Sequence, residues 1–151
     1  MATRVTKYKI ELVKENSGNY DLENNGALTH PSMVASALNK IFNLENQTDE
    51  HFVMLCLNTK NKIIGAFEIC IGTIDTSLVN IRGIMQRALL CNASRIMIAH
   101  NHPSGNSEPS NEDKKTTTNI RKACDLIGIP LLDHIIIGED EYFSFKGEGL
   151  L

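Results

Sequence analysis

The chain has 151 residues, of which 42% are hydrophobic and 22% are charged, and its formal net charge is −3. This composition is typical of a single globular domain and excludes a disordered chain. It also argues against a protein that binds nucleic acid mainly through the phosphates, because such proteins usually carry a basic domain or stripe. The one local basic cluster is better explained as a solvated helix face: Lys114, Lys115, Arg121 and Lys122.

The sequence predicts neither a membrane protein nor an exported one. Its apolar runs fall short of the ~18 residues that a membrane span needs, and its first residues lack the apolar segment of a signal peptide. Four cysteines are widely spaced and form no Cys-x-x-Cys pair: Cys56, Cys70, Cys91 and Cys124. We therefore expect free, buried thiols in a reducing compartment and a cytoplasmic location.

Strands and helices are predicted to alternate along the chain. Residues 5–14 alternate between apolar and polar side chains and could form an edge strand, and residues 17–30 are rich in turn formers. The later elements are, in order, a helix opened by Pro31, a β-hairpin of 52–57 and 62–71, a helix over 80–91, a buried strand over 95–102, a helix over 110–127, and strands at 131–137 and 142–145.

This mixed order predicts one α/β domain over residues 1–151, with a central mixed β-sheet and flanking helices. Residues 1–50 would form a lead-in of one strand and one helix. Residues 51–151 would carry the functional motifs.

The most informative stretch runs from His100 to Asp113. If residues 95–102 form a strand, its period of two places His100 and His102 on the same face. Ser110 would then begin the next helix, with Asp113 in its first turn. Two nitrogen ligands, one oxygen ligand and an open fourth position make up the ligand set of a catalytic zinc site, whereas a structural site would fill all four positions.

Each part of this motif also has a simpler explanation. A His-x-His pair on a strand occurs by chance, and Ser110-x-x-Asp113 fits a capping box that needs no metal. A serine-hydrolase constellation of Ser104 or Ser110 with His102 and Asp113 lacks the Gly-x-Ser-x-Gly elbow. The metal site is favoured because all the motif residues fall at one strand–loop–helix junction, where a helix N-terminus also favours negative charge.

Glu68 is the candidate general base. Residues 63–71 carry apolar side chains at both odd- and even-numbered positions, which predicts a central strand that is covered on both faces. A carboxylate in such a strand needs a partner, and a polar pocket with a metal-bound water would provide one and allow proton transfer. An edge strand with Glu68 pointing to solvent explains the same residues equally well, and both interpretations stay open.

The residues resemble the JAMM motif of MPN-type metalloproteases, in which His-x-His, seven residues, Ser, two residues and Asp follow an upstream glutamate. The chain is most similar to the RadC group of JAB/MPN domains, and this resemblance covers roughly residues 52–151. The stretches that carry it are Glu68-x-x-x-Gly72-Thr73, His-Asn-His-Pro-Ser-Gly at 100–105, Pro-Ser-x-x-Asp at 109–113, Leu-Asp-His-Ile-Ile-Ile-Gly at 132–138, Ser144-Phe145 and Gly149-Leu150. RadC proteins usually carry a helix-hairpin-helix segment ahead of this domain, and the residues before Phe52 lack that pattern. We therefore expect DNA binding to be weak or absent.

The resemblance implies that His100, His102 and Asp113 bind one zinc ion per chain, with water at the fourth position. It also implies that Glu68 takes a proton from that water and that Ser110 donates a hydrogen bond to the oxyanion. The expected function is that of a zinc-dependent metallopeptidase-type hydrolase, which cleaves a peptide or isopeptide bond in a protein substrate. The alternatives are a DNA repair or recombination module that binds metal without peptidase activity, and a metal-dependent nuclease.

Asp133 and His134 also recur in the RadC group. Because neighbouring residues on a strand face opposite ways, at most one of them can point toward the metal ligands. A supporting role for His134 behind the ligands is therefore open.

Overall fold

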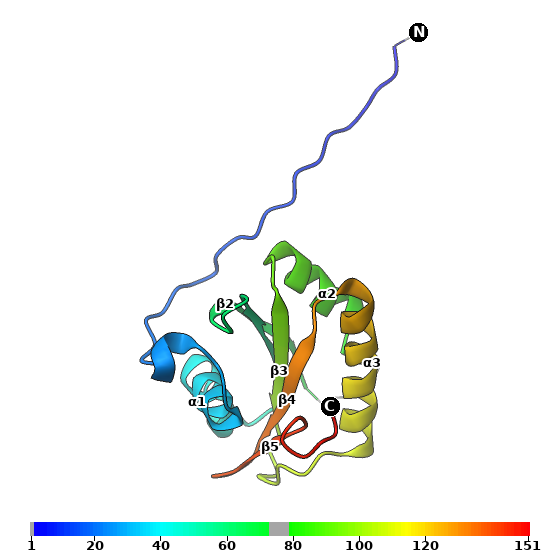
Figure 1. Ribbon diagram of the computed structural model, residues 1–151. Coiled ribbons are helices and arrows are strands. Elements are labelled where there is room, and N and C mark those ends of the chain that lie inside the picture. Colours follow the sequence, from blue (N-terminus) through cyan, green and yellow to red (C-terminus); the bar gives the residue numbers. More distant parts are fainter. Residues whose placement is uncertain (1, 73–78) are drawn as a thin grey trace.

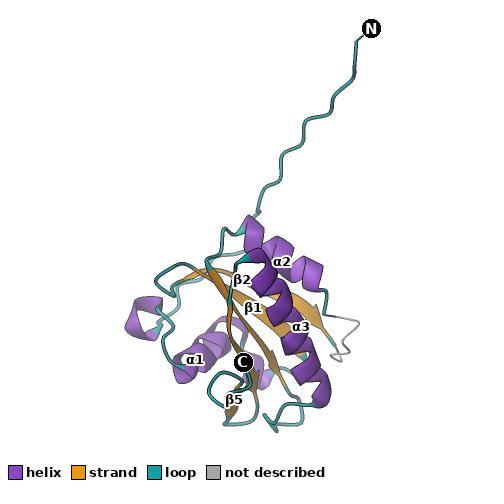
Figure 2. Ribbon diagram, turned by 45° about the vertical axis from the view of Figure 1, so that its right-hand side comes forward, coloured by secondary structure: helices purple, strands orange, loops and turns teal. Residues whose placement is uncertain are grey.

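The computed structural model describes residues 2–72 and 79–151, so Thr73 of the family-like motif lies outside the described residues. Within these ranges five strands form one sheet in the order β2-β1-β3-β4-β5, and three α-helices pack on it (Figures 1 and 2). The elements are η1 (Glu23–Gly26), α1 (Pro31–Phe42), η2 (Leu44–Asn46), β1 (His51–Leu57), β2 (Ile63–Ile71), α2 (Ile81–Leu90), β3 (Arg95–Asn101), α3 (Asn111–Ile127), β4 (Leu131–Ile137) and β5 (Tyr142–Ser144).

The sheet separates two hydrophobic layers. Helix α1 covers one face, and α2 and α3 cover the other (Figure 1). Because strand residues alternate, Val53 of β1 packs in the layer of α1, whereas Phe52 packs in the layer of α2 and α3. Strands β3 and β4 are parallel and the other pairs are antiparallel, which confirms the predicted α/β domain with a mixed sheet.

The predicted hairpin of β1 and β2 is confirmed, and its turn is held by Asn58. The side-chain Oδ1 of Asn58 accepts hydrogen bonds from the backbone N–H groups of Lys60 and Lys62, at 2.9 and 3.1 Å. Asn61 has a φ of 57°, a left-handed conformation that asparagine tolerates better than most residues. The turn chemistry of the sequence therefore fixes the register with which β2 joins the sheet.

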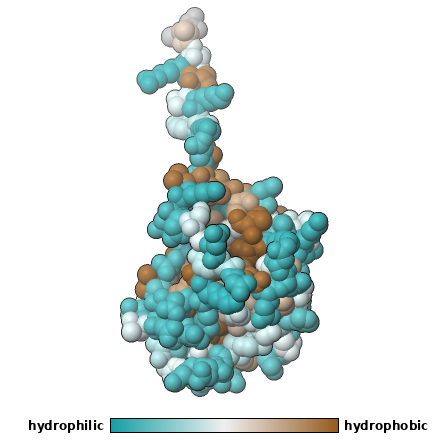
Figure 3. Space-filling model, turned by 90° about the vertical axis from the view of Figure 1, so that its left-hand side faces the viewer, coloured by the Kyte–Doolittle hydropathy of each residue, from teal (hydrophilic) through white to brown (hydrophobic). Residues whose placement is uncertain are grey.

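The predicted strand over residues 5–14 is wrong. The segment projects from the domain as an extended chain (Figures 1 and 3). Its residues Val5 and Tyr8 are 83% and 84% exposed. An alternating pattern gives each side chain a face, but a strand also needs a neighbour to complete its ladder of hydrogen bonds. Among the described residues this segment pairs with no strand.

Of the two interpretations left open for residues 63–71, the edge strand is confirmed and the central strand is wrong. Strand β2 lies at the edge of the sheet, and its side chains alternate between exposed and partly buried. Its apolar residues of both parities do not reflect coverage on two faces, because Ile64 and Ile71 remain 44% and 54% exposed. The strands that are covered on both faces are β1, β3 and β4.

All four cysteines are free thiols, as predicted. Cys56 and Cys124 are buried, and Cys70 and Cys91 are partly buried. Burial raises the pKa of the Cys124 thiol to about 11, which keeps it protonated and unreactive at neutral pH. In the parts of the chain that the structure describes, no helix combines the length and the hydrophobicity needed to cross a lipid bilayer.

Candidate metal centre

Four side chains converge at one end of the sheet: Glu50, His100, His102 and Asp113. Their potential ligand atoms all lie within 4.8 Å of one another. Glu50 directly precedes β1, His100 lies near the end of β3, His102 follows that strand, and Asp113 lies in the first turn of α3. The structure thus brings together the three residues that were predicted from the sequence as metal ligands. It adds a second carboxylate, that of Glu50, which was not predicted.

The spacing within this group matches a tetrahedral cation site. The Nε2 atoms of His100 and His102 are 3.0 Å apart. Asp113 Oδ1 is 3.2 Å from His100 Nε2, and Asp113 Oδ2 is 3.4 Å from His102 Nε2. Ligands held at about 2.0–2.2 Å from a tetrahedral zinc ion are themselves roughly 3.3–3.6 Å apart. Glu50 Oε1 lies farther out, at 3.8 Å from His100 Nε2.

Hydrogen bonding directs the lone pair of His102 toward the centre of the group. Its Nδ1 lies 2.7 Å from the backbone carbonyl oxygen of Asn106, which can only accept. A neutral His102 therefore carries its proton on Nδ1 and has a lone pair on Nε2. A lone pair aimed at another imidazole nitrogen and at a carboxylate requires a proton or a cation among them, and this donor set therefore fits a metal ion.

Protons can compete for the same place, as the pKa shifts indicate. The hydrogen bond to Asp113 raises the pKa of His102, and this effect exceeds the opposing effect of burial. Burial acts to raise the pKa of Asp113, but its interactions with the imidazoles of His100 and His102 outweigh burial and hold that pKa well below its usual range. Asp113 is therefore a carboxylate at any pH near neutral, as a metal ligand must be.

Ser110 and Asp113 form the capping box that begins α3. The backbone N–H of Asp113 donates to Ser110 Oγ at 3.1 Å, and that of Ser110 donates to Asp113 Oδ2 at 2.8 Å. The Ser110 hydroxyl also donates to Oδ2, at 2.6 Å. The capping and ligand interpretations are therefore compatible, because the cap holds Oδ2 while Oδ1 faces His100.

The structure does not bring Glu68 into this group. Glu68 pairs in register with Val53, whereas His100 pairs with Phe52. Since Val53 and Phe52 face opposite sides of the sheet, the side chain of Glu68 lies in the layer of α1, across the sheet from His100. This position agrees with the edge-strand interpretation of Glu68.

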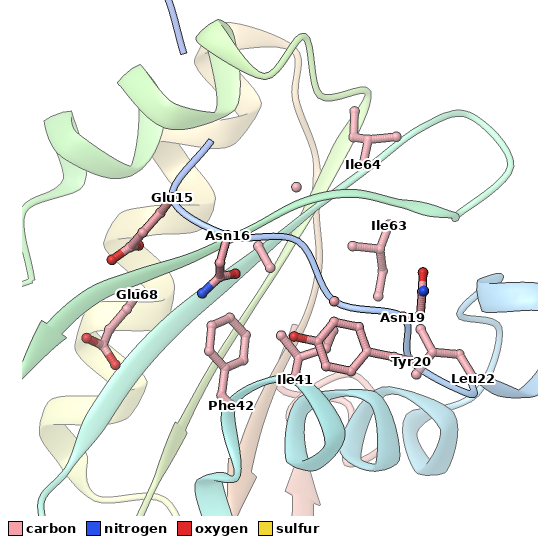
Figure 4. A pocket seen from close by; sticks show the side chains of 13 residues that line it. Glu15, Asn16, Asn19, Tyr20, Leu22, Ile41, Phe42, Ile63, Ile64 and Glu68 are labelled. Atoms are coloured by element: carbon pink, nitrogen blue, oxygen red, sulfur yellow. The ribbon is translucent and has the colours of Figure 1, made fainter. Parts of the chain in front are cut away.

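Glu68 has a different partner and a different cavity. Its carboxylate, with the side chain 44% exposed, lies 2.8 Å from His51 Nδ1. It lines a cavity of about 710 Å³ between β2, the end of α1 and the N-terminal segment, together with residues such as Phe42 and Tyr20 (Figure 4). None of the four converging residues lines that cavity.

Sequence reasoning missed Glu50 because it ends the polar stretch 45–50, which gives no signal of function. The signal that could have found it is topological. Strands β1 and β3 are antiparallel, so the start of β1 lies beside the end of β3, and Phe52 pairs with His100. The backbone of Glu50 is fixed there by the N–H of Gly72, which donates to its carbonyl oxygen at 2.8 Å.

Asp133 and His134 face opposite sides of β4, as strand geometry requires. His134 is fully buried beside His100, with its Nε2 at 2.8 Å from His100 Nδ1. Asp133 instead accepts hydrogen bonds from the Ser144 hydroxyl, at 2.6 Å, and from the backbone N–H of Lys146, at 3.0 Å. The prediction that at most one of the two points toward the ligands is confirmed.

A cavity adjoins His102. This cavity of about 400 Å³ is lined by His102, by residues 103–105 after it, by residues 137–140 after β4, and by residues 44–47 around η2. Among the described residues, its lining includes the acidic residues Glu45, Glu139 and Asp140 and no lysine or arginine. A ligand in this cavity would lie directly beside one of the imidazoles of the group.

The fold and the group of converging side chains define a JAB-like α/β domain with a candidate metal site. Residues 28–150 match the sequence model of the family described as RadC-like JAB domain. The chain therefore belongs to the RadC-like JAB domain family, as the motif resemblance predicted.

Curated relatives carry the name UPF0758 protein. The relative from Rubrobacter xylanophilus is 46% identical over 108 residues, which cover 72% of this chain and 47% of the relative. That from Chlorobaculum parvum is 43% identical over 108 residues, covering 72% and 49%. That from Clostridioides difficile is 50% identical over 97 residues, covering 64% and 41%. The chain thus spans about half the length of the curated relatives it matches.

Proposed function

We propose that this protein is a zinc-dependent hydrolase of the JAMM class that cleaves a peptide or isopeptide bond in a protein substrate. One observation carries the proposal: two imidazole nitrogens and a carboxylate are spaced 3.0–3.4 Å apart, with a second carboxylate slightly farther out. Three ligands that leave a fourth position open are typical of catalytic zinc. This mixed set of imidazole and carboxylate ligands also favours zinc, because Mg²⁺ and Ca²⁺ prefer sites in which all the ligands are oxygen atoms.

In this mechanism His100, His102 and Asp113 would hold the ion. Zinc, when bound, supplies Lewis acidity that lowers the pKa of a water toward ~7 and polarises the substrate carbonyl. Glu50 is the carboxylate beside the three ligands, and it would accept a proton from the attacking water and deliver it to the leaving amine. Glu50 therefore takes over the role that the family resemblance implied for Glu68.

The direct test combines metal analysis with a substrate panel. The purified protein should contain about one zinc per chain, and chelation should abolish hydrolysis of peptide or isopeptide substrates until zinc is restored. DNA binding should be weak and should fall steeply with salt. Zinc without any peptide-bond hydrolysis would support a repair-associated binding module instead, and zinc-dependent DNA cleavage would support a nuclease.

Ser110→Ala should affect both stability and turnover. Loss of the helix cap should destabilise the protein by about 1 kcal/mol. If Ser110 also donates to the oxyanion, turnover should fall by about 10²-fold in the folded, zinc-loaded variant. Ser110→Thr, which keeps the hydroxyl, is the matched control. Melting temperature, zinc content and turnover measured on the same preparations separate the two effects, and unchanged turnover would reduce Ser110 to a cap.

Zinc affinity should decrease as the pH falls through the raised pKa of His102. The imidazole must lose its second proton to bind metal, and the hydrogen bond to Asp113 makes that proton harder to remove. Below that pKa the apparent dissociation constant should rise about tenfold for each pH unit, because one proton is released on binding. Zinc titrations across neutral and acidic pH measure this slope. A flat profile would exclude His102 as a ligand.

A further inference from the structure

We infer that Thr117 acts through His134 to keep the Nε2 atom of His100 unprotonated. Thr117 is then a positioning residue, which fixes the tautomer of a ligand that it does not contact. The importance of this tautomer for metal binding rests on the proposed function. The direction of the hydrogen bonds does not depend on the proposed function.

Three buried side chains form a continuous chain of hydrogen bonds behind the metal group. Thr117 lies in α3, one turn after Asp113, and its Oγ1 is 2.6 Å from the backbone carbonyl oxygen of Asp113. The same Oγ1 is 2.6 Å from His134 Nδ1. His134 Nε2 is in turn 2.8 Å from His100 Nδ1, which leaves His100 Nε2 to face Asp113 and His102.

The carbonyl of Asp113 determines the direction of this chain. A carbonyl oxygen can only accept, and two oxygens 2.6 Å apart repel unless a hydrogen lies between them. The Thr117 hydroxyl therefore donates to Asp113, and its oxygen accepts from His134 Nδ1–H. A neutral imidazole has one N–H, so His134 Nε2 accepts in turn from His100 Nδ1–H. His100 then carries no proton on Nε2, the atom that faces the other ligands.

Burial makes the arrangement selective. His100 and His134 are fully buried and Thr117 is 2% exposed, so solvent cannot supply alternative partners. Phe52 stacks on His100 with an interplanar angle of 11°, and Phe145 stacks on His134 with an angle of 9°. Ring rotation, which would replace Nδ1 and Nε2 by ring carbon atoms at these positions, is therefore opposed by close packing as well as by the hydrogen bonds.

Asp113 thereby acts at two points of the site. Its side chain faces both imidazoles, and its backbone carbonyl orients one of them through Thr117 and His134. Reversing the hydroxyl would reverse every later hydrogen bond and would put a proton on His100 Nε2. That proton would occupy the direction needed for a metal ion, which predicts a loss of affinity without any change in the ligand set.

The test compares two neighbouring threonines of α3. Thr117→Val removes the hydroxyl that contacts His134, whereas Thr118→Val removes a hydroxyl that donates to the Lys114 carbonyl in the same i−4 manner but at an exposed position. Zinc affinity, measured by competition with a chromophoric chelator, should fall by about 10-fold or more in Thr117→Val. It should stay within about twofold in Thr118→Val, and Thr117→Ser should restore it.

The tautomer of His100 provides a readout that does not depend on metal or on activity. In ¹⁵N NMR spectra of the zinc-free protein, His100 should carry its proton on Nδ1, and Thr117→Val should shift His100 toward the other tautomer. Thr117→Ala is a second, smaller variant with the same expectation, for use if valine impairs folding.

Unchanged tautomer and affinity in a folded Thr117 variant would overturn the inference. A wild-type protein that binds no zinc, but whose His100 tautomer depends on Thr117, would overturn the proposed function and leave the inference intact.

Discussion

Glu50→Gln is expected to lower hydrolysis by a factor on the order of 10² or more while zinc content stays near one per chain. Glutamine keeps the size of the side chain but cannot accept the proton of the attacking water. Zinc should remain because Glu50 Oε1 lies 3.8 Å from His100 Nε2, outside the tighter spacing of the three proposed ligands. Turnover and metal content, measured on the same sample, distinguish loss of a base from loss of a ligand.

Glu68→Gln is the matched control, since it makes the same chemical change on the other face of the sheet. In the part of the chain that the structure describes, it weakens the half-exposed pairing with His51, which contributes no more than about 1 kcal/mol. We expect near-normal turnover and normal zinc content. An inactive Glu68→Gln beside an active Glu50→Gln would return the general-base role to Glu68. Loss of zinc in Glu50→Gln would make Glu50 a fourth ligand.

His102→Ala is expected to lose most of the bound zinc, and all measurable hydrolysis with it. Only His100 and Asp113 would remain as protein ligands, fewer than the three of a catalytic site. His102 is the suitable position because its side chain is 17% exposed, so its removal disturbs packing less than removal of the fully buried His100.

His51→Ala, which changes a histidine outside the metal group, serves as the control for this experiment. Elemental analysis after dialysis against a weak chelator measures the difference between the two variants. Full zinc retention in His102→Ala would show that the ligands are misassigned.

The part of the site that could be predicted from sequence is the part that local structure assembles. His100 and His102 are related by strand periodicity, and Ser110 and Asp113 by the first turn of a helix, so spacing along the chain is enough to group them. Glu50 reaches the same point only because β1 pairs with β3, which brings it beside a residue fifty positions later. No local pattern encodes that pairing.

The two errors in the fold have the same origin. Apolar periodicity predicts which side chains of β2 and of residues 5–14 share a face. It does not identify the strands or helices that lie beside those segments. Strand β2 has a neighbour on one side only, and the N-terminal segment has none among the described residues. The elements α2, β3 and α3 follow one another closely in the sequence and pack together. For them, the predicted secondary structure and the observed structure agree.

The metal group lies at the boundary between α3 and the sheet. One carboxylate comes from the helix, and both imidazoles come from the end of β3. An ion bound there would connect two elements that otherwise meet through side-chain packing, so occupancy and docking of the helix are thermodynamically linked. By mass action, a ligand present at a thousand times its dissociation constant adds about 4 kcal/mol to the free energy of unfolding. The supply of metal would then control the resistance of this protein to proteolysis as well as its activity.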